Sequence, residues 1–259
     1  MNTPTEKFFA ICPRGLEPLL ADELRALGGQ QLVSEGGGVS FSGPLATAYA
    51  ANLHSRIASR VLWQLAAGGY RDERDLYERA AAVAWERHFD ARQTLRVDLG
   101  ASRSPLRSLD FATLKIKDAI VDRLREATGA RPSIDRARPD VRVFAYLDEQ
   151  RLTLYLDLSG EPLFKRGWRA EKGEAPLKEN LAAAILIRAG WPAIAREGGA
   201  QFDHRADIPR MQRLHRLAGG AIDPVELADP LGFAAVGVHQ FRSGKHVTAV
   251  KNSRHGNRG

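Results

Sequence analysis

The pattern of apolar and polar positions in the first 68 residues predicts six short elements. A largely apolar run that ends at Pro13 is typical of a buried strand, and the leucines that follow recur at helical spacing until Gly28 and Gly29. Two further short runs flank the glycines at 36–38, which is the pattern of a hairpin. We expect strands over 7–12, 31–34, 39–42 and 57–65, and helices over 16–27 and 44–54. This order, βαββαβ, predicts a ferredoxin-like unit over residues 1–68.

The pattern after Gly68 and Gly69 predicts a second α/β unit. Its clearest element is a helix over 111–128, in which Ile116, Ile120, Leu124 and Ala127 share one face. Alternating positions on either side of residues 148–150 predict two strands of a hairpin. We expect helices over 72–84 and 177–189 and strands over 95–99, 141–147 and 152–158.

The pattern changes after Trp191 and Pro192. Glycine, proline, arginine and histidine follow one another without a sustained period, and five of the seven histidines lie in this stretch. Such a composition favours a weakly ordered tail. We therefore expect an α+β protein whose tail covers residues 192–259.

The charge balance of the 259 residues favours a polyanionic partner. Lysine and arginine number 38 against 31 aspartates and glutamates, a net charge of +7. Such an excess binds phosphates through counterion release, although it does not distinguish DNA from RNA. A single cysteine excludes an internal disulfide bond and a cysteine-based zinc site, and no apolar run is long enough for a membrane span or a signal peptide. These features predict a cytoplasmic protein without a membrane partner.

Basic residues gather in two places. Arg103, Arg107, Lys115 and Lys117 fall on a loop and the first turns of the helix over 111–128, where cations and free backbone amides suit phosphate contacts. The alternative is a solvated helix face, in which Asp118 and Asp122 pair with the lysines.

The second basic cluster combines cations with an indole. Its residues are Lys165, Arg166, Trp168 and Arg169. An exposed tryptophan between arginines can stack on an unpaired base, while a buried one would anchor a domain interface. The two readings stay open.

No catalytic or metal-ligating residues can be proposed. The histidines at 204, 215, 239 and 246 lack ligand spacing, and no Ser-His-Asp or Cys-His arrangement is present. The glycines at 36–38 and 198–199 are not followed by the Gly-Lys-Ser/Thr of a phosphate-binding loop.

With these residues in hand, the chain resembles the bacterial bifunctional 23S rRNA guanine-N2/guanine-N7 methyltransferases. The resemblance covers about residues 8–191. It rests on the segments Arg14–Glu17, Ser55–Arg60, Asp75–Tyr77, Lys115–Asp122, Asp157–Gly160, Arg166–Arg169 and Ala175–Ala184. It implies a ferredoxin-like subdomain over 1–68, a THUMP RNA-binding domain over 69–169 and a linking helix over 170–191. In the family a Rossmann-like methyltransferase domain with S-adenosylmethionine follows.

The chain departs from the family after residue 192. The family has a strand there that ends in Asp-Pro-Met-Cys-Gly-Ser-Gly-Thr, the loop that holds S-adenosylmethionine, and later an Asn-Pro-Pro-Tyr motif that grips guanine. Residues 198–205 contain no such glycine loop, and the second motif is absent too. We therefore expect no cofactor in this chain and no methyl transfer by it alone.

The resemblance implies that the chain docks structured RNA, 23S rRNA in particular and not DNA, for base methylation. The expected contacts are those of the two basic clusters above. One alternative is a subunit of a split methyltransferase whose catalytic domain is on another chain. A second alternative is a truncated remnant without a function.

Overall fold

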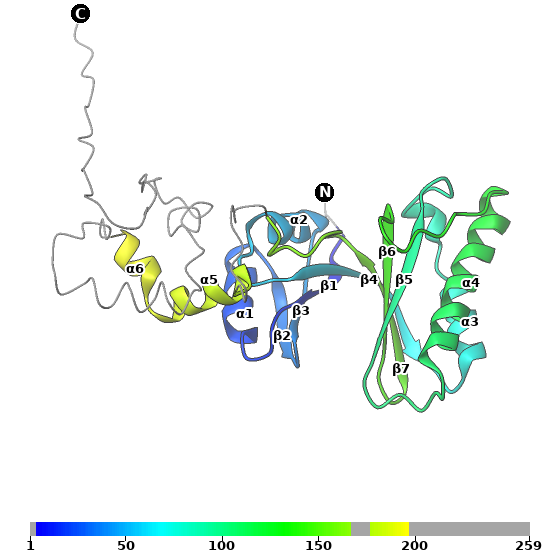
Figure 1. Cartoon of the computed structure of the whole chain (residues 1–259), viewed down its shortest axis with the longest axis horizontal. Helices are drawn as coiled ribbons and strands as arrows, with labels where there is room; N and C mark the ends of the chain where they lie inside the picture. Colours follow the sequence, from blue (N-terminus) through cyan, green and yellow to red (C-terminus); the bar gives the residue numbers. More distant parts are fainter. Residues whose placement is uncertain (1–3, 167–176, 197–259) are drawn as a thin grey trace, which may run out of the picture.

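The computed structural model describes residues 4–166 and 177–196. One seven-stranded sheet runs through both halves of the molecule, in the order β2-β3-β1-β4-β7-β6-β5. Only β5 and β6 are parallel. The strands are β1 (Glu6–Ile11), β2 (Gln30–Glu35), β3 (Gly38–Gly43), β4 (Arg60–Gly69), β5 (Leu95–Ala101), β6 (Val141–Leu147) and β7 (Arg151–Asp157). Figure 1 shows helices α1 and α2 at one end of this sheet and α3 and α4 at the other.

The N-terminal half has the predicted ferredoxin-like fold. Helices α1 (Glu17–Ala26) and α2 (Leu45–His54) alternate with β1 to β4 in the order expected from the sequence. Their apolar faces meet Phe8, Val39 and Phe41 of the sheet in one buried cluster. Burial of such side chains contributes on the order of 25 cal/mol per Å² of apolar surface.

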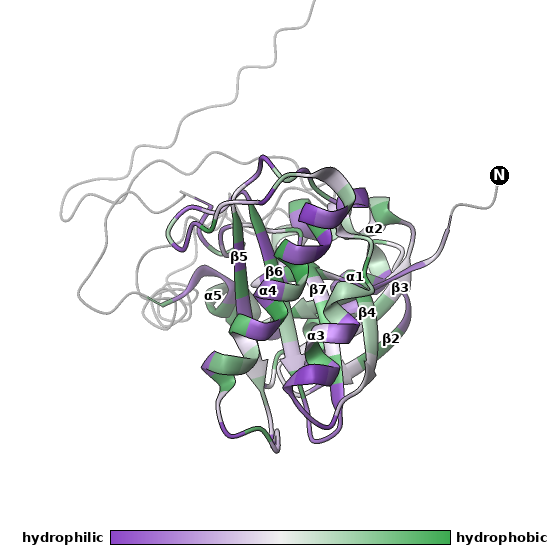
Figure 2. Cartoon of the chain, turned by 90° about the vertical axis from the view of Figure 1, so that its right-hand side faces the viewer, coloured by the Kyte–Doolittle hydropathy of each residue, from purple (hydrophilic) through white to green (hydrophobic). Residues whose placement is uncertain are grey.

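The second half packs α3 (Glu73–Ala81) and α4 (Leu109–Thr128) on β5, β6 and β7, next to the short 3₁₀ helix η1 (Trp85–Arg87). Ile116, Ile120 and Leu124 are buried as predicted, but Ala127, one residue before the end of α4, is exposed. Gly129 then ends α4 with a φ of 73°, a left-handed conformation that glycine adopts without steric cost. Figure 2 shows the hydrophilic residues of α3 and α4 on the outside of this layer.

Strand β4 belongs to both halves. Phe8 to Ile11 of β1 pair with Trp63 to Arg60 on one side of it, and β7 pairs with Leu62 to Gly69 on the other. The boundary that we expected between residues 68 and 69 therefore lies at the end of a shared strand. No linker separates the halves, so the sheet fixes their relative orientation.

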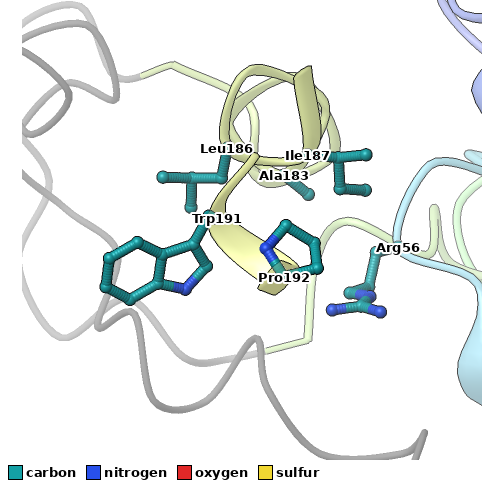
Figure 3. Close-up of a pocket in the computed structure, with 6 residues that line it drawn as sticks. All are labelled: Arg56, Ala183, Leu186, Ile187, Trp191 and Pro192. Atoms are coloured by element: carbon teal, nitrogen blue, oxygen red, sulfur yellow. The ribbon is translucent and has the colours of Figure 1, made fainter. Parts of the chain in front are cut away.

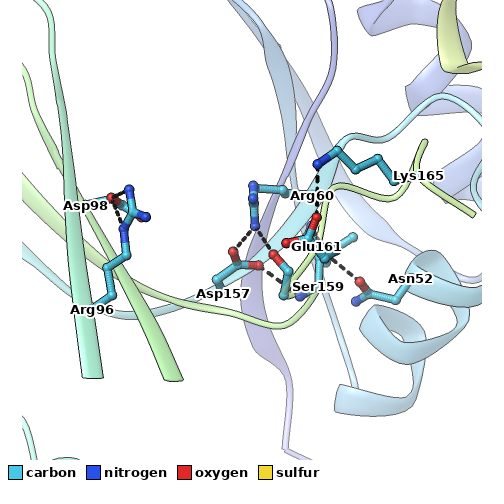
Figure 4. Close-up of polar contacts among 10 residues, drawn as sticks. Asn52, Arg60, Arg96, Asp98, Asp157, Ser159, Glu161 and Lys165 are labelled. Atoms are coloured by element: carbon cyan, nitrogen blue, oxygen red, sulfur yellow. Dashed lines mark hydrogen bonds and ion pairs between the residues drawn. The ribbon is translucent and has the colours of Figure 1, made fainter. Parts of the chain in front are cut away.

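A polar joint fastens the halves beside β4, and Figure 4 shows it. The Ser159 hydroxyl accepts from the Val61 amide at 2.8 Å and donates to Asn52 Oδ1 of α2 at 2.7 Å. Arg60 donates to the Asp157 carboxylate and, at 2.6 Å, to the Gly160 carbonyl oxygen. Burial raises the pKa of Asp157, and the Ser159 amide and Arg60 oppose that rise. Most of the segment Asp157–Gly160, on which the resemblance partly rests, therefore has a structural role.

A second polar joint connects α1 with the turn that follows α2. The Glu23 carboxylate accepts from the Ser55 hydroxyl at 2.7 Å and from the Arg56 and Ile57 amides. These partners hold the turn between α2 and β4, although burial still raises the pKa of Glu23. The Asn180 side chain donates to the Ile57 carbonyl oxygen at 3.3 Å, so the same turn also holds the C-terminal helix.

The helix expected over 177–189 is present as α5 (Glu179–Arg188), and a further helix, α6 (Trp191–Arg196), follows it. Residues 192–196 were expected in a weakly ordered tail, and this was wrong. Pro192 fits the first turn of a helix, and Trp191 is 8% exposed against the N-terminal core. Figure 3 shows Trp191 and Pro192 beside Leu186 and Ile187 of α5, with Arg56 opposite. The rest of the expected tail, from residue 197, lies outside the described residues.

None of the helices in the described ranges is long and apolar enough to cross a bilayer.

Candidate nucleic-acid interface

The loop between β5 and α4 is held to the protein by Ser104 and Leu106, and its Arg103 and Arg107 point to solvent. The Tyr70 hydroxyl donates to the Asp148 carbonyl oxygen at 2.7 Å and lies 2.8 Å from Ser104 Oγ. Leu106 packs against the core of the same half, so Ser104 and Leu106 face the protein. Arg103 and Arg107 are exposed. Arg103 has a φ of 55°, an uncommon conformation for a residue with a side chain.

Helix α4 begins directly after this loop. The Ser108 hydroxyl caps it by accepting from the Phe111 amide at 3.2 Å. The amides of a helix's first turn have no partner within the helix and carry a partial positive charge, which suits an anion. Arg107 lies one residue before this cap, so cation and helix terminus are close together.

Lys115 lies one helical turn after Phe111. Its Nζ is 5.3 Å from the centre of the Phe111 ring, and its side chain lines an open hollow with Arg74, Tyr77 and Glu78 of α3. Phe111 itself is 47% exposed. An ammonium group above an exposed aromatic ring can hold a phosphate while the ring meets a base.

Three carboxylates around this surface have partners of their own, whereas Asp110 in the first turn of α4 has none among the described residues. Glu78 pairs with Arg74 at 2.8 Å, Asp75 pairs with Arg71 at 3.0 Å, and Asp122 pairs with Arg125 at 3.0 Å. Within residues 4–166 and 177–196, no ion pair or hydrogen bond of the Arg103, Arg107 or Lys115 side-chain nitrogens is found. These three cations form the surface that we call the β5–α4 face.

Lys117 lies apart from this face. Its Nζ pairs with Asp118 at 2.6 Å, and its side chain is 22% exposed. In the part of the chain that the structure describes, the nearby Lys115 has no such pair. The alternative of a solvated, ion-paired helix surface therefore fits Lys117 and does not fit Lys115.

The residues of the second basic cluster have different surroundings. Arg166 is half-buried, and its guanidinium donates to the carbonyl oxygens of Asn52, Leu53, Ser55 and Leu163 at 2.8–3.0 Å. It thereby caps the end of α2, and desolvation lowers its pKa. Lys165 is exposed and pairs with Glu161 at 3.1 Å. Trp168 and Arg169 lie outside the described residues.

The sequence analysis missed an apolar part of the β5–α4 face. Leu109, Phe111 and Leu114 are 41%, 47% and 46% exposed. Ala112, four residues before Ile116 and therefore on the same side of the helix, is buried. Phe111 therefore lies off the buried stripe, and the same periodicity that identified the helix could have shown it.

Comparisons with known proteins agree with this architecture. Residues 7–62 match the family described as the RlmL ferredoxin-like domain, and residues 70–157 match the THUMP domain. The chain is 53% identical over 203 residues to the ribosomal RNA large subunit methyltransferase K/L of Syntrophotalea carbinolica, and 49% identical over 197 residues to that of Pseudomonas aeruginosa. These matches cover 78% and 76% of the chain but only 28% and 27% of the relatives.

Two solved structures are similar in fold. One is a predicted N6-adenine-specific DNA methylase from Listeria monocytogenes, at 29% identity with a TM-score of 0.64, which covers 71% of this chain and 48% of that one. The other is SMU.472, a putative methyltransferase complexed with SAH, at 28% identity and a TM-score of 0.64. It covers 74% of this chain and 50% of its own.

The sequence resemblance is thereby confirmed for the matched region. The THUMP domain is an RNA-binding domain, and it carries the β5–α4 face. The chain therefore carries an RlmL ferredoxin-like domain followed by a THUMP domain, and over 203 residues it is similar to part of a ribosomal RNA large subunit methyltransferase K/L.

Proposed function

We propose that this chain docks structured ribosomal RNA, that of the large subunit, for methylation by a catalytic domain. The observation that carries the proposal is a group of three cations around the start of α4, Arg103, Arg107 and Lys115, that have no ion pair within the described residues. The nearby Asp75, Glu78 and Asp122 are already paired, and Asp110 is the acidic residue in the first turn of α4, so a phosphate backbone would meet three cations beside one further carboxylate.

The contacts would be mainly to phosphates. Arginine side chains, a lysine and helix amides position an RNA without reading its sequence, and double-stranded RNA is recognised mostly by shape. Phe111 would add a stacking contact to one unpaired base at the edge of the duplex. Lys165 is a second-rank candidate because Glu161 partly neutralises it.

We assign the catalytic role to the part of the relatives that this chain does not cover. This chain spans about 28% of the methyltransferase from Syntrophotalea carbinolica. We assign the binding of S-adenosylmethionine, the methyl donor that such a protein would use, to a methyltransferase domain outside residues 7–157. That domain could be supplied by a separate chain.

A mobility-shift titration with 23S rRNA fragments tests the proposal. Arg103→Gln/Arg107→Gln should weaken binding to every structured fragment by a similar factor. The matched control is Arg25→Gln/Arg92→Gln, which removes two exposed arginines that are paired with Asp22 and Asp90. Equal losses in the two double variants would refute a specific role of the β5–α4 face.

A further inference from the structure

The sheet of the THUMP half has one face that none of the described helices covers. Along β6, Val141, Val143, Ala145 and Leu147 alternate toward the core under α3 and α4. The residues between them, Arg142, Phe144 and Tyr146, are partly exposed on the opposite face. Figure 1 shows α3 and α4 together on one side of β5, β6 and β7.

A line of aromatic rings crosses this helix-free face from strand to strand. Phe144 of β6 pairs with Tyr155 of β7, and their ring centres are 6.5 Å apart. The Tyr155 ring is in turn 6.3 Å from Phe9 of β1, in the ferredoxin-like half. Tyr155 thus lies between the other two rings, and burial there raises its pKa to about 12.

Tyr146 extends the aromatic surface into solvent. It is 39% exposed and lies two residues from Phe144 on the same face. Gly100 of the edge strand β5 makes room for both rings: a Cβ at this position would lie 3.0 Å from Phe144 Cζ and 3.5 Å from Tyr146 Cδ2. The rings therefore extend over the neighbouring strand and leave a partly exposed aromatic surface.

A line of basic residues runs beside the aromatic line. Arg96 of β5 is the register partner of Arg142 of β6, and Arg60 of β4 follows across β7. Arg96 pairs with Asp98 at 2.7 Å and Arg60 with Asp157, as Figure 4 shows. Arg142 favours the charged form of Asp157, but the described residues offer its guanidinium no hydrogen bond. Glu161, which pairs with Lys165, also interacts with Arg142 and Arg60, so four cations stand against three carboxylates.

On β6, Arg142 lies two residues from Phe144, about 7 Å, and four residues from Tyr146, about 13 Å. A nucleotide has a flat base and a phosphate on opposite sides of its sugar. The aromatic rings could therefore contact the base while the arginines contact the phosphate. We propose that this face binds unpaired nucleotides of an RNA, with bases stacked on Tyr146 and Phe144 and phosphates beside Arg142 and Arg96. This surface is distinct from the β5–α4 face, and the inference does not depend on the proposed function.

A binding titration with short RNA tests this inference. The probe is an unstructured oligoadenylate of about ten nucleotides, within the range of single-stranded binding sites, that carries one 2-aminopurine. Stacking on an aromatic ring should quench the 2-aminopurine fluorescence. Tyr146→Ser should weaken binding at least about fivefold and reduce the quenching. Arg142→Gln should weaken binding and lower its salt dependence, with quenching at saturation unchanged.

Tyr49→Ser is the matched control, because Tyr49 is 58% exposed on α2, away from this face. Circular dichroism of each variant reports whether it is folded. The inference is overturned if the parent does not bind the oligonucleotide, or if Tyr146→Ser and Arg142→Gln bind as tightly as Tyr49→Ser. A hairpin RNA titrated in parallel with Arg103→Gln/Arg107→Gln reports on the β5–α4 face separately.

Discussion

Arg60 of β4 donates a hydrogen bond to the Asp157 carboxylate of β7, whose side chain is only 4% exposed. Removing the cation leaves a desolvated carboxylate that retains the Ser159 amide as a donor. We therefore predict that Arg60→Ala lowers the free energy of unfolding by about 3 kcal/mol, the range for breaking a buried pair. Urea denaturation measures this change.

Arg25→Ala is the control for that substitution. Arg25 pairs with Asp22 at the surface, where both side chains are more than half exposed, and such a pair contributes at most about 1 kcal/mol. Equal stability of the two variants would show that Arg60 and Asp157 do not fasten the halves.

Two glutamates of α1 should titrate on opposite sides of the ordinary value. Burial raises the pKa of Glu23, whereas hydrogen bonds from its own amide and from the Gly37 and Gly15 amides lower the pKa of Glu17. Carbon-detected NMR titration of the two carboxyl groups measures both values. A Glu23 pKa at or below that of Glu17 would contradict the described burial of Glu23.

The Glu23 shift also has a consequence for stability. The folded chain holds the Glu23 proton more tightly than the unfolded chain, so ionisation of Glu23 lowers the free energy of unfolding as the pH rises above about 4.5. The loss continues up to the raised pKa of the folded state and then stays constant. Glu23→Gln should remove this part of the pH dependence, which unfolding curves at several pH values measure.

Most of the sheet could be predicted from the sequence because its signals are local. The alternation in residues 141–147 and the stripe through Ile116, Ile120 and Leu124 each depend on neighbours along the chain. The sharing of β4 could not be predicted, since it depends on pairing between Leu62 and Asp157, which are far apart in sequence. The helix after Gly190 was missed because Pro192 was interpreted only as the end of a pattern.

The site was harder to predict than the fold. A cluster of cations in the sequence does not reveal which of them form hydrogen bonds or ion pairs within the protein. Arg166 and Arg107 look alike in the sequence, yet the first is surrounded by carbonyl oxygens and the second is exposed. Phe111 was overlooked because its position at the start of α4 places it off the buried stripe.

Arg166 is expected to affect stability and not RNA affinity. Its guanidinium meets carbonyl oxygens around the end of α2, and a lysine lacks the planar fork that reaches several acceptors at once. Arg166→Lys should lower the free energy of unfolding by roughly 1–3 kcal/mol. If it left stability unchanged and reduced the salt dependence of RNA binding, the original expectation of an RNA contact would be correct.

Phe111 is expected to affect RNA affinity and not stability. Because it is 47% exposed, Phe111→Ala should change the unfolding free energy by less than about 0.5 kcal/mol. Loss of a stacked base should weaken RNA binding by roughly 1–3 kcal/mol with an unchanged salt dependence. Val33→Ala, which alters an exposed side chain on β2, is the control. An affinity equal to that of this control would exclude Phe111 from the interface.

The central claim is that Arg103, Arg107 and Lys115 contact RNA phosphates. The most direct test measures the affinity for one structured 23S rRNA fragment over a range of salt concentrations, for the parent and for Arg107→Gln/Lys115→Gln. The logarithm of affinity should fall linearly with that of salt, and the slope should decrease in magnitude by roughly 0.7–0.9 for each phosphate contact removed. A double variant with the slope and the affinity of the parent at every salt concentration would contradict the account.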